Sequence, residues 1–186
     1  MPVTQLDQTA ALVVIDLQKG ITAMTMVHPA GDIVARTAGL ANAFRARSLP
    51  VVLVNVTGMA PGRTDTPRPA FSLPPDWADL APELNAQLTD IRISKQRVGA
   101  FIGTPLDEEL RRRGVTQIFL TGIATGSGVE ATARSAYDHG YHVCFVSDAM
   151  TDRDADVHRD AIEKTFPRLG QVDTTERVLQ LLSERR

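Results

Sequence analysis

The chain has 186 residues, of which 43% are hydrophobic and 23% are charged, and its formal net charge is −2 at pH 7. An isoelectric point of about 6.1 argues against the basic surface that nucleic-acid-binding proteins need, so we expect no nucleic-acid partner. The length fits a single domain over residues 1–186, which can bury a sizeable core without disulfides or metal ions.

The N-terminus and the cysteine content indicate the cellular setting. The first ten residues, "MPVTQLDQTA", show no basic run before an apolar stretch, so no secretory signal is expected. No segment reaches the roughly 18 uninterrupted apolar residues that span a bilayer, and we expect no membrane partner. Cys144 is the only cysteine, which excludes an intramolecular disulfide and favours a cytoplasmic location.

The first half of the chain alternates apolar runs with an amphipathic segment. Residues 10–16 predict a strand, residues 32–48 a helix with Asp32 as its candidate N-cap, and residues 51–56 and 91–94 two more strands. The apolar runs are mostly rich in Val and Ile and show little alternation, which is typical of strands buried on both faces of a parallel sheet.

A long segment, residues 57–82, interrupts this alternation. It contains six of the eleven prolines and the only tryptophan, Trp77. Loops of this length are usually functional or disordered, and the tryptophan favours a packed loop. Two interpretations stay open: a surface crossing that covers the sheet edge, or a substrate lid or subunit contact.

The second half returns to regular alternation. It predicts helices at residues 105–114, 127–140, 154–166 and 174–185, and strands at residues 117–122, 142–148 and around 170–172. Strands and helices in this order imply right-handed crossovers. The sequence therefore predicts an α/β fold, a doubly wound three-layer α/β/α sandwich with a six-stranded, mostly parallel sheet.

Polar residues at the ends of the predicted strands are the candidates for a site, because ligands of doubly wound sheets bind beyond the carboxyl ends of the strands. The first strand ends in Asp16, with Gln18 close behind. The second strand delivers Asn55, the third Lys95 and the fifth Asp148.

Asp16 and Lys95 are the strongest of these candidates. Burial raises the pKa of a carboxyl such as Asp16, a nearby ammonium lowers it, and a carboxyl tuned in this way can act as general acid or base. Lys95 can steady that carboxyl, bind a substrate carboxylate or stabilise an oxyanion. The alternatives are that Asp16 caps a turn and that Lys95 is a solvated loop residue.

The fourth strand runs into "TGIATGSGVEATAR" (121–134), where a helix is expected to begin near Ser127. Helix N-termini that follow strands are frequent positions for anions and nucleophiles, yet this turn contains no cysteine. We expect the Thr125 hydroxyl to bond the backbone and the Ser127 hydroxyl to point elsewhere. Cys144 lies inside the fifth strand, where a buried small hydrophobe is expected.

Four stretches resemble the isochorismatase-like hydrolases, also called cysteine hydrolases: "ALVVIDLQKG" (11–20), "SKQRVGAFIGTPLDEELRRRGVTQIFLTGIAT" (94–125), "VEATARSAYDHGYHVCFVSDAM" (129–150) and "TTERVLQLL" (174–182). The resemblance implies an α/β fold with a six-stranded parallel sheet and a homodimer or larger homo-oligomer. Most members of the family cleave amides, ureas or related C–N bonds of small molecules with an Asp–Lys–Cys triad.

By this resemblance, Asp16 and Lys95 are catalytic, and Gly128 stands where the family has its cysteine nucleophile. The resemblance also implies a cis peptide between Ile123 and Ala124, with the N–H groups of Ala124 and residue 128 turned toward the substrate oxygen. The residues expected to bind substrate are Gln18, Asn55, Phe101, Ala124 and Thr125.

Three functions stay open. In the first, Asp16 and Lys95 hydrolyse a small polar or carboxylated metabolite without a thiol, as in the isochorismatases of the family, which look like Gly at the nucleophile position and hydrolyse a vinyl ether. In the second, the protein is a thiol amidase whose cysteine is replaced by Gly128. In the third, the site binds a metabolite without turnover. Because Ala124 and Gly126 stand where isochorismatases carry an aromatic residue and a histidine, isochorismate itself is not assigned as the substrate.

No metal and no cofactor are expected. Nicotinamidases of the family bind a metal through an Asp-x-His and a further His after the second strand, whereas residues 55–90 contain no histidine. The four histidines of the chain lack the spacing of ligands on one helix face. The segment "DLQKG" (16–20) lacks the G-x-G-x-x-G spacing of a dinucleotide site.

Overall fold

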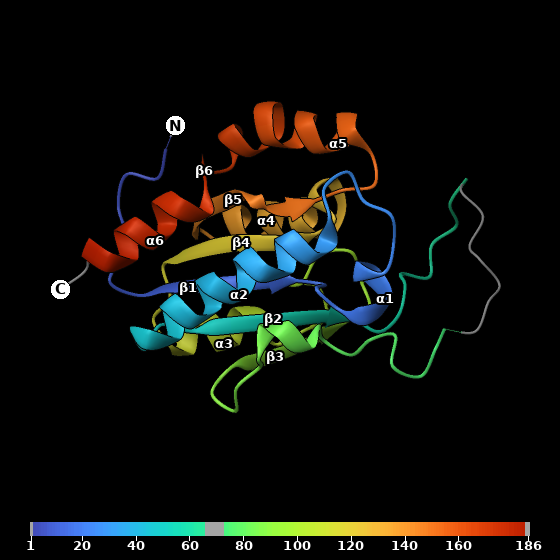
Figure 1. The fold of residues 1–186 in the computed structure, drawn as a ribbon, viewed down its shortest axis with the longest axis horizontal. Coiled ribbons are helices and arrows are strands. Elements are labelled where there is room, and N and C mark those ends of the chain that lie inside the picture. Colours follow the sequence, from blue (N-terminus) through green and yellow to red (C-terminus); the bar gives the residue numbers. More distant parts are fainter. Residues whose placement is uncertain (1, 66–72, 185–186) are drawn as a thin grey trace.

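The fold is described by a computed structural model that covers residues 2–65 and 73–184 (Figure 1). Its strands form one six-stranded sheet in the order β3-β2-β1-β4-β5-β6, and all neighbouring strands are parallel. The strands are β1 (Ala10–Ile15), β2 (Val51–Val56), β3 (Ile91–Lys95), β4 (Gln117–Ile123), β5 (His142–Thr151) and β6 (Gln171–Asp173). The predicted doubly wound parallel sheet is confirmed.

Helices cover both faces of the sheet (Figure 1). One face packs against α2 (Ala30–Ala46) and α6 (Thr175–Glu184). The other face packs against α3 (Leu106–Arg112), α4 (Glu130–Asp138) and the segment that starts with α5 (Ala155–Asp160). Shorter elements are α1 (Lys19–Thr22) and the single turns Pro82–Leu84, Thr125–Val129, Ala161–Thr165 and Phe166–Arg168.

The central strand β1 explains why the predicted strands show so little alternation. Leu12 and Val14 lie in the core on the side of α2, whereas Val13 and Ile15 lie in the core on the side of α4. Every residue of β1 is 0% exposed. A strand buried on both faces needs apolar side chains at all positions, and burial of this kind is the main stabilising term of the fold.

The starts of two helices differ from the prediction. The carbonyl oxygen of Pro29 already accepts hydrogen bonds from the N–H groups of Asp32 and Ile33, so α2 begins at Ala30. The expectation that Asp32 is the N-cap is therefore wrong, and its carboxylate lies in the first turn, where the helix dipole favours it. The chain after β4 first makes a wide turn over residues 125–129, and α4 begins only at Glu130.

The described part of segment 57–82 is tied to the end of β1. The Lys19 ammonium lies 3.0 Å from the Asp76 carboxylate and 3.2 Å from the Asp79 carboxylate. The carbonyl oxygen of Trp77 accepts hydrogen bonds from the Gly20 N–H group and from the Gln18 amide. Residues 66–72 of this segment lie outside the described residues. No helix in the part of the chain that the structure covers is long and apolar enough to cross a membrane.

We expect Gly122→Ala to lower the free energy of unfolding by about 3 kcal/mol. Gly122 has φ of +117°, and a Cβ atom there would overlap the backbone of Ile15 on β1. In the control variant Gly39→Ala, the new Cβ atom in α2 meets nothing within 4 Å, so stability should rise by about 0.5–1 kcal/mol. Urea unfolding measures both variants, and equal changes would contradict this account.

Candidate active site

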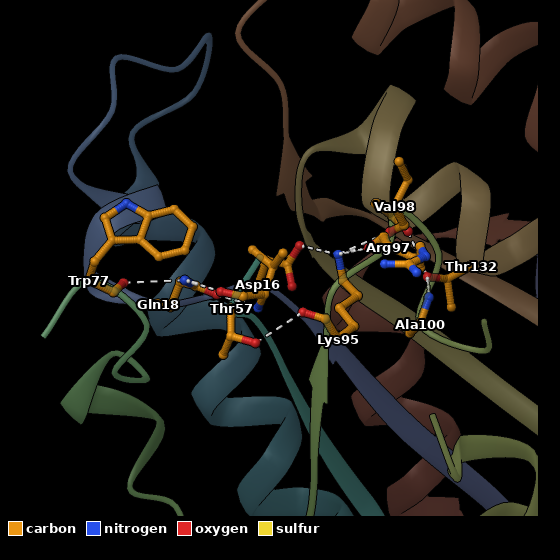
Figure 2. Close-up of polar contacts among 11 residues, drawn as sticks. Asp16, Gln18, Thr57, Trp77, Lys95, Arg97, Val98, Ala100 and Thr132 are labelled. Carbon is orange, nitrogen blue, oxygen red and sulfur yellow. Dashed lines mark hydrogen bonds and ion pairs between the residues drawn. The ribbon is translucent and has the colours of Figure 1, made fainter. Parts of the chain in front are cut away.

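A cleft of about 510 Å³ opens beyond the carboxyl ends of β1, β3 and β4. Three of its lining residues are Asp16, which follows β1, Lys95, which ends β3, and Gly128, which lies in the turn after β4. The structure therefore brings together the three residues that the sequence places at the catalytic centre. Figure 2 shows Asp16 and Lys95 directed toward each other.

Asp16 and Lys95 form a buried ion pair. The Asp16 Oδ2 atom lies 2.8 Å from Lys95 Nζ, and the two side chains are 8% and 3% exposed. Lys95 Nζ also donates hydrogen bonds to the carbonyl oxygens of Arg97 and Val98, at 3.2 and 3.0 Å (Figure 2). These three partners use all three donors of the ammonium group, so its position against the carboxylate is well defined.

The protonation equilibrium of Asp16 is shifted toward the neutral, protonated form of its carboxyl. Burial raises the pKa of this carboxyl to about 6, although the charge and the hydrogen bond of Lys95 oppose the shift. Asp16 Oδ1 is buried and has no hydrogen-bond partner among the described residues. The carboxyl therefore keeps one unused acceptor and gains or loses its proton close to neutral pH, as acid–base catalysis requires.

Gly128 leaves the space beside this carboxyl without a side chain. A Cβ atom at residue 128 would lie 3.3 Å from Asp16 Oδ2 and 3.1 Å from Ile15 Cγ2. A side chain at this position would thus stand directly beside the acid–base group. The peptide bond between Ile123 and Ala124 is cis, as the family resemblance implies, and both residues line the cleft.

One side chain from the junction after β5 and one from α5 hold the turn that forms the floor of the cleft. Asp152 Oδ2 accepts a hydrogen bond of 2.8 Å from the Gly126 N–H group. Thr125 Oγ1 lies 2.8 Å from Nδ1 of the buried His158. The expectation that the Thr125 hydroxyl bonds the backbone is therefore wrong, and Thr125 is fully buried and does not line the cleft.

Gln18 and Asn55, two of the expected substrate-binding residues, lie outside the cleft. The Gln18 amide is fully buried and bonds both backbone groups of Val56, at 2.8 and 3.1 Å. The Asn55 amide donates to the Ala78 carbonyl and accepts from the Ser94 hydroxyl. The Gln18 amide therefore holds Val56, which lines the cleft, whereas the Asn55 amide joins β2 to Ala78 and Ser94 outside the cleft lining.

Phe101 and Asp148 also lie away from the cleft lining. Phe101 is buried in the core on the α3–α4 face, and its ring stacks on His139 at 5.2 Å. Asp148 lies inside β5, where its carboxylate accepts hydrogen bonds from the N–H group and the hydroxyl of Thr175 at the start of α6. The expectation that Asp148 ends the fifth strand is wrong, since the strand continues through an irregular stretch to Thr151.

The structure adds lining residues that the sequence did not single out. Arg153 comes from the junction that follows the real end of β5, and Arg97 follows β3. Three methionines, Met24, Met26 and Met59, line the same cleft. Arg153 lies just beyond the end of an apolar strand, which is a signal that the sequence contains. This signal is missed when the strand is predicted to end at residue 148.

Cys144 is poorly placed to act as a nucleophile, and the described side chains form no metal-binding cluster. Cys144 is buried in the core, and burial raises the pKa of its thiol to about 12, so a thiolate is scarce at neutral pH. Within residues 2–65 and 73–184, no group of three or more His, Cys, Asp and Glu side chains is arranged to hold a metal ion.

We expect Lys95→Met to reduce stability in a pH-dependent way. Without the ammonium, the pKa of Asp16 rises above its present value of about 6, because the charge that lowers it is gone. Above that pKa an unpaired carboxylate is buried, and the free energy of unfolding should fall by about 3 kcal/mol at pH 8. At pH 5 the carboxyl is protonated, so the loss should be much smaller.

Urea unfolding at the two pH values tests this expectation. The double variant Lys95→Met/Asp16→Asn is the control, since it contains no ionisable group at the pair. Its loss in free energy of unfolding should be the same at pH 5 and pH 8. An equal loss of stability at both pH values in the single variant would show that the buried charge is not the cause.

Comparison with known proteins identifies the family of the chain. Residues 10–177 match the isochorismatase domain. The isochorismatase family protein YwoC of Bacillus subtilis is 40% identical over 181 residues, which cover 93% of this chain and 94% of that protein. The ureidoacrylate amidohydrolase RutB of Methylobacterium radiotolerans is 30% identical over 175 residues, which cover 76% of this chain and 66% of that protein.

Solved structures show the same fold. An isochorismatase family protein from Burkholderia thailandensis superposes with a TM-score of 0.93 and 47% identity, over 96% of this chain and 98% of that one. N-carbamoylsarcosine amidase from Thermoplasma acidophilum gives a TM-score of 0.74 and 25% identity, over 91% and 98% of the two chains. On the combined evidence of sequence and fold, this chain belongs to the isochorismatase family of hydrolases.

Proposed function

We propose that this protein hydrolyses a small polar or carboxylated molecule with water as the nucleophile, using Asp16 as the acid–base group and Lys95 as its charge partner. One observation carries the proposal. The Asp16 carboxyl, held 2.8 Å from Lys95 Nζ, stands beside the side-chain-free Gly128 in a single cleft. The position of a covalent nucleophile is thereby available to water or to the substrate.

Cleavage of a C–N bond proceeds in two proton transfers. With a pKa of about 6, Asp16 is ionised in about ten of eleven molecules at pH 7. The carboxylate takes a proton from water as the water oxygen bonds to the substrate carbonyl carbon. The same proton passes to the leaving nitrogen as the C–N bond breaks, which restores the carboxylate. Lys95 stabilises the carboxylate at the beginning and end of this cycle.

The relatives support this reaction class. RutB is a ureidoacrylate amidohydrolase, and the structural neighbour from Thermoplasma acidophilum is an N-carbamoylsarcosine amidase. Both names describe enzymes that act on amide-type C–N bonds. The proposal takes the bond type from these relatives and the acid–base pair from the geometry of this chain.

The raised pKa of Asp16 favours a second candidate, hydrolysis of a vinyl ether. Near pH 6, half of the Asp16 carboxyls carry a proton. A protonated carboxyl can transfer this proton to the carbon of the double bond, and water then adds to the resulting cation and returns a proton to the carboxylate. In the adduct, the hydroxyl proton passes to the ether oxygen as the C–O bond breaks, which releases an alcohol and leaves a carbonyl compound. This reaction also needs no nucleophile at Gly128.

The pH profile distinguishes the two reactions. For C–N cleavage, kcat/KM should rise with pH through an apparent pKa of about 6, because Asp16 must be ionised. Asp16→Asn should lower kcat by at least about 100-fold. Products from a panel of small amides, ureido acids and vinyl ethers are followed by mass spectrometry.

Other results of the same assay would change the assignment. A rate that falls above pH 6 assigns the vinyl ether reaction, in which the protonated acid is the active form. No turnover of any compound, with equal ligand affinity in the native protein and Asp16→Asn, would instead assign a protein that binds a metabolite without catalysis.

The variant Gly128→Cys tests whether the site is that of a thiol amidase that has lost its cysteine. The new Cβ atom would lie close to Ile15 Cγ2, which is a side-chain atom and can shift slightly. The start of a helix and the nearby Lys95 should lower the pKa of the thiol, so amidase activity on small amides should appear. Ser127 also lines the cleft, so the control is Ser135→Cys, which places a thiol in α4 away from the cleft lining. A folded Gly128→Cys protein whose thiol is alkylated without any gain of activity would reject the idea.

A further inference from the structure

The walls of the cleft carry two groups of residues that the proposed chemistry does not use. One group is cationic, Arg97 and Arg153, and the other is apolar and includes Met24, Met26 and Met59. Together they surround the Asp16–Lys95 pair on the same cleft. Their chemistry specifies what kind of molecule the cleft accepts.

The arginines leave a positive charge in the cleft that its other lining residues do not balance. Among the described residues that line the cleft, Asp16 is the only acid, and it is paired with Lys95. The adjacent Asp152 is occupied by the N–H groups of Gly126 and Arg153, at 2.8 and 2.7 Å. Within the described ranges, neither arginine forms an ion pair. The cleft therefore attracts anions.

Arg153 is the better placed of the two arginines to bind an anion. Arg97 Nη1 already donates a hydrogen bond of 2.9 Å to the Gln96 carbonyl oxygen. The Arg153 guanidinium makes no hydrogen bond to any residue that the structure describes, so its planar fork of donors is available. A guanidinium of this kind matches the two oxygens of a carboxylate.

The apolar wall excludes a strongly hydrated substrate body. Met59 is 60% exposed, Val98 50% and Met24 38%, and all three line the cleft. Side chains of this size are usually exposed together only where they contact a ligand or partner. Among the described lining residues, Thr64 and Ser127 are the only uncharged polar side chains, which are few for a polyhydroxylated molecule. Methionines adapt to bodies of different shape.

The geometry points to an amphipathic anion as the substrate, with a carboxylate bound by Arg153 and an apolar body packed on Met24, Met26 and Met59. This inference rests on the proposed function, because the bond to be cleaved must lie over Gly128. It adds the class of substrate: a carboxylic acid whose apolar part fills the methionine wall.

Calorimetric titration with three inert probes tests this inference. The probes are 4-phenylbutanoate, 4-phenylbutan-1-ol and acetate, which contain no bond that the proposed reaction cleaves. We expect 4-phenylbutanoate to bind at least about tenfold more tightly than the other two, since only it offers both the charge and the apolar body. Arg153→Gln should weaken the binding of 4-phenylbutanoate about tenfold and leave the binding of 4-phenylbutan-1-ol unchanged.

Two further variants complete the design. Arg92→Gln removes an exposed arginine of β3 that does not line the cleft, so binding of all three probes should be unchanged. Met59→Ser should weaken the binding of both phenyl compounds and leave the binding of acetate unchanged. Both Arg153 and Met59 are exposed, and thermal unfolding verifies that their variants fold as the native protein does.

The possible results separate this inference from the proposed function. Equal affinities for the acid and the alcohol, or no effect of Arg153→Gln, would overturn the substrate class. Selective binding of the acid without turnover of any carboxylated amide or vinyl ether would uphold the substrate class and reject the hydrolase. Turnover of neutral compounds with no preference for acids would uphold the hydrolase and reject the substrate class.

Discussion

The buried ion pair between Asp16 and Lys95 is the interaction on which the site depends. The two residues end β1 and β3, which are separated in the sheet by β2. Neighbouring strands lie about 5 Å apart, so a long side chain is needed to span the distance from β3, and Figure 2 shows the Lys95 ammonium reaching the Asp16 carboxylate. Asp16 has φ of +52°, a conformation in which the chain turns sharply as it leaves β1. A parallel sheet is what aligns these two strand ends at the same edge.

Burial gives this pair its chemical character. Water is largely excluded from both side chains, so the carboxylate is poorly solvated and its pKa is raised to about 6 even though an ammonium lies beside it. The pair therefore contributes little net charge to the cleft, and its carboxyl changes protonation state near neutral pH. The charge that attracts a ligand comes instead from Arg97 and Arg153, which are exposed. The paired charges of the cleft are thus buried, whereas its unpaired charges are exposed.

The floor of the cleft depends on contacts that are remote in sequence. The turn after β4 is held by Asp152 and His158, which follow it by more than twenty residues. Gln18 and Trp77 fasten the loop after β2 to the end of β1 on the opposite side. Several polar residues that first suggest substrate binding are in fact used to fix the backbone around the cleft, because buried amides and hydroxyls must find partners.

The sequence by itself determined the order of strands and helices along the chain, the parallel doubly wound sheet, and the candidates Asp16 and Lys95. These conclusions follow from local patterns: apolar runs without alternation specify doubly buried strands, and strand ends specify one edge of the sheet. Family resemblance added the role of Gly128. Only the tertiary structure decided that the side chains of Gln18, Asn55 and Thr125 bond to other parts of the chain, that Phe101 packs in the core, and that Arg153 and the methionines line the cleft. The direction of a side chain near a strand end depends on hydrogen-bond partners and packing from distant segments, which no local pattern encodes.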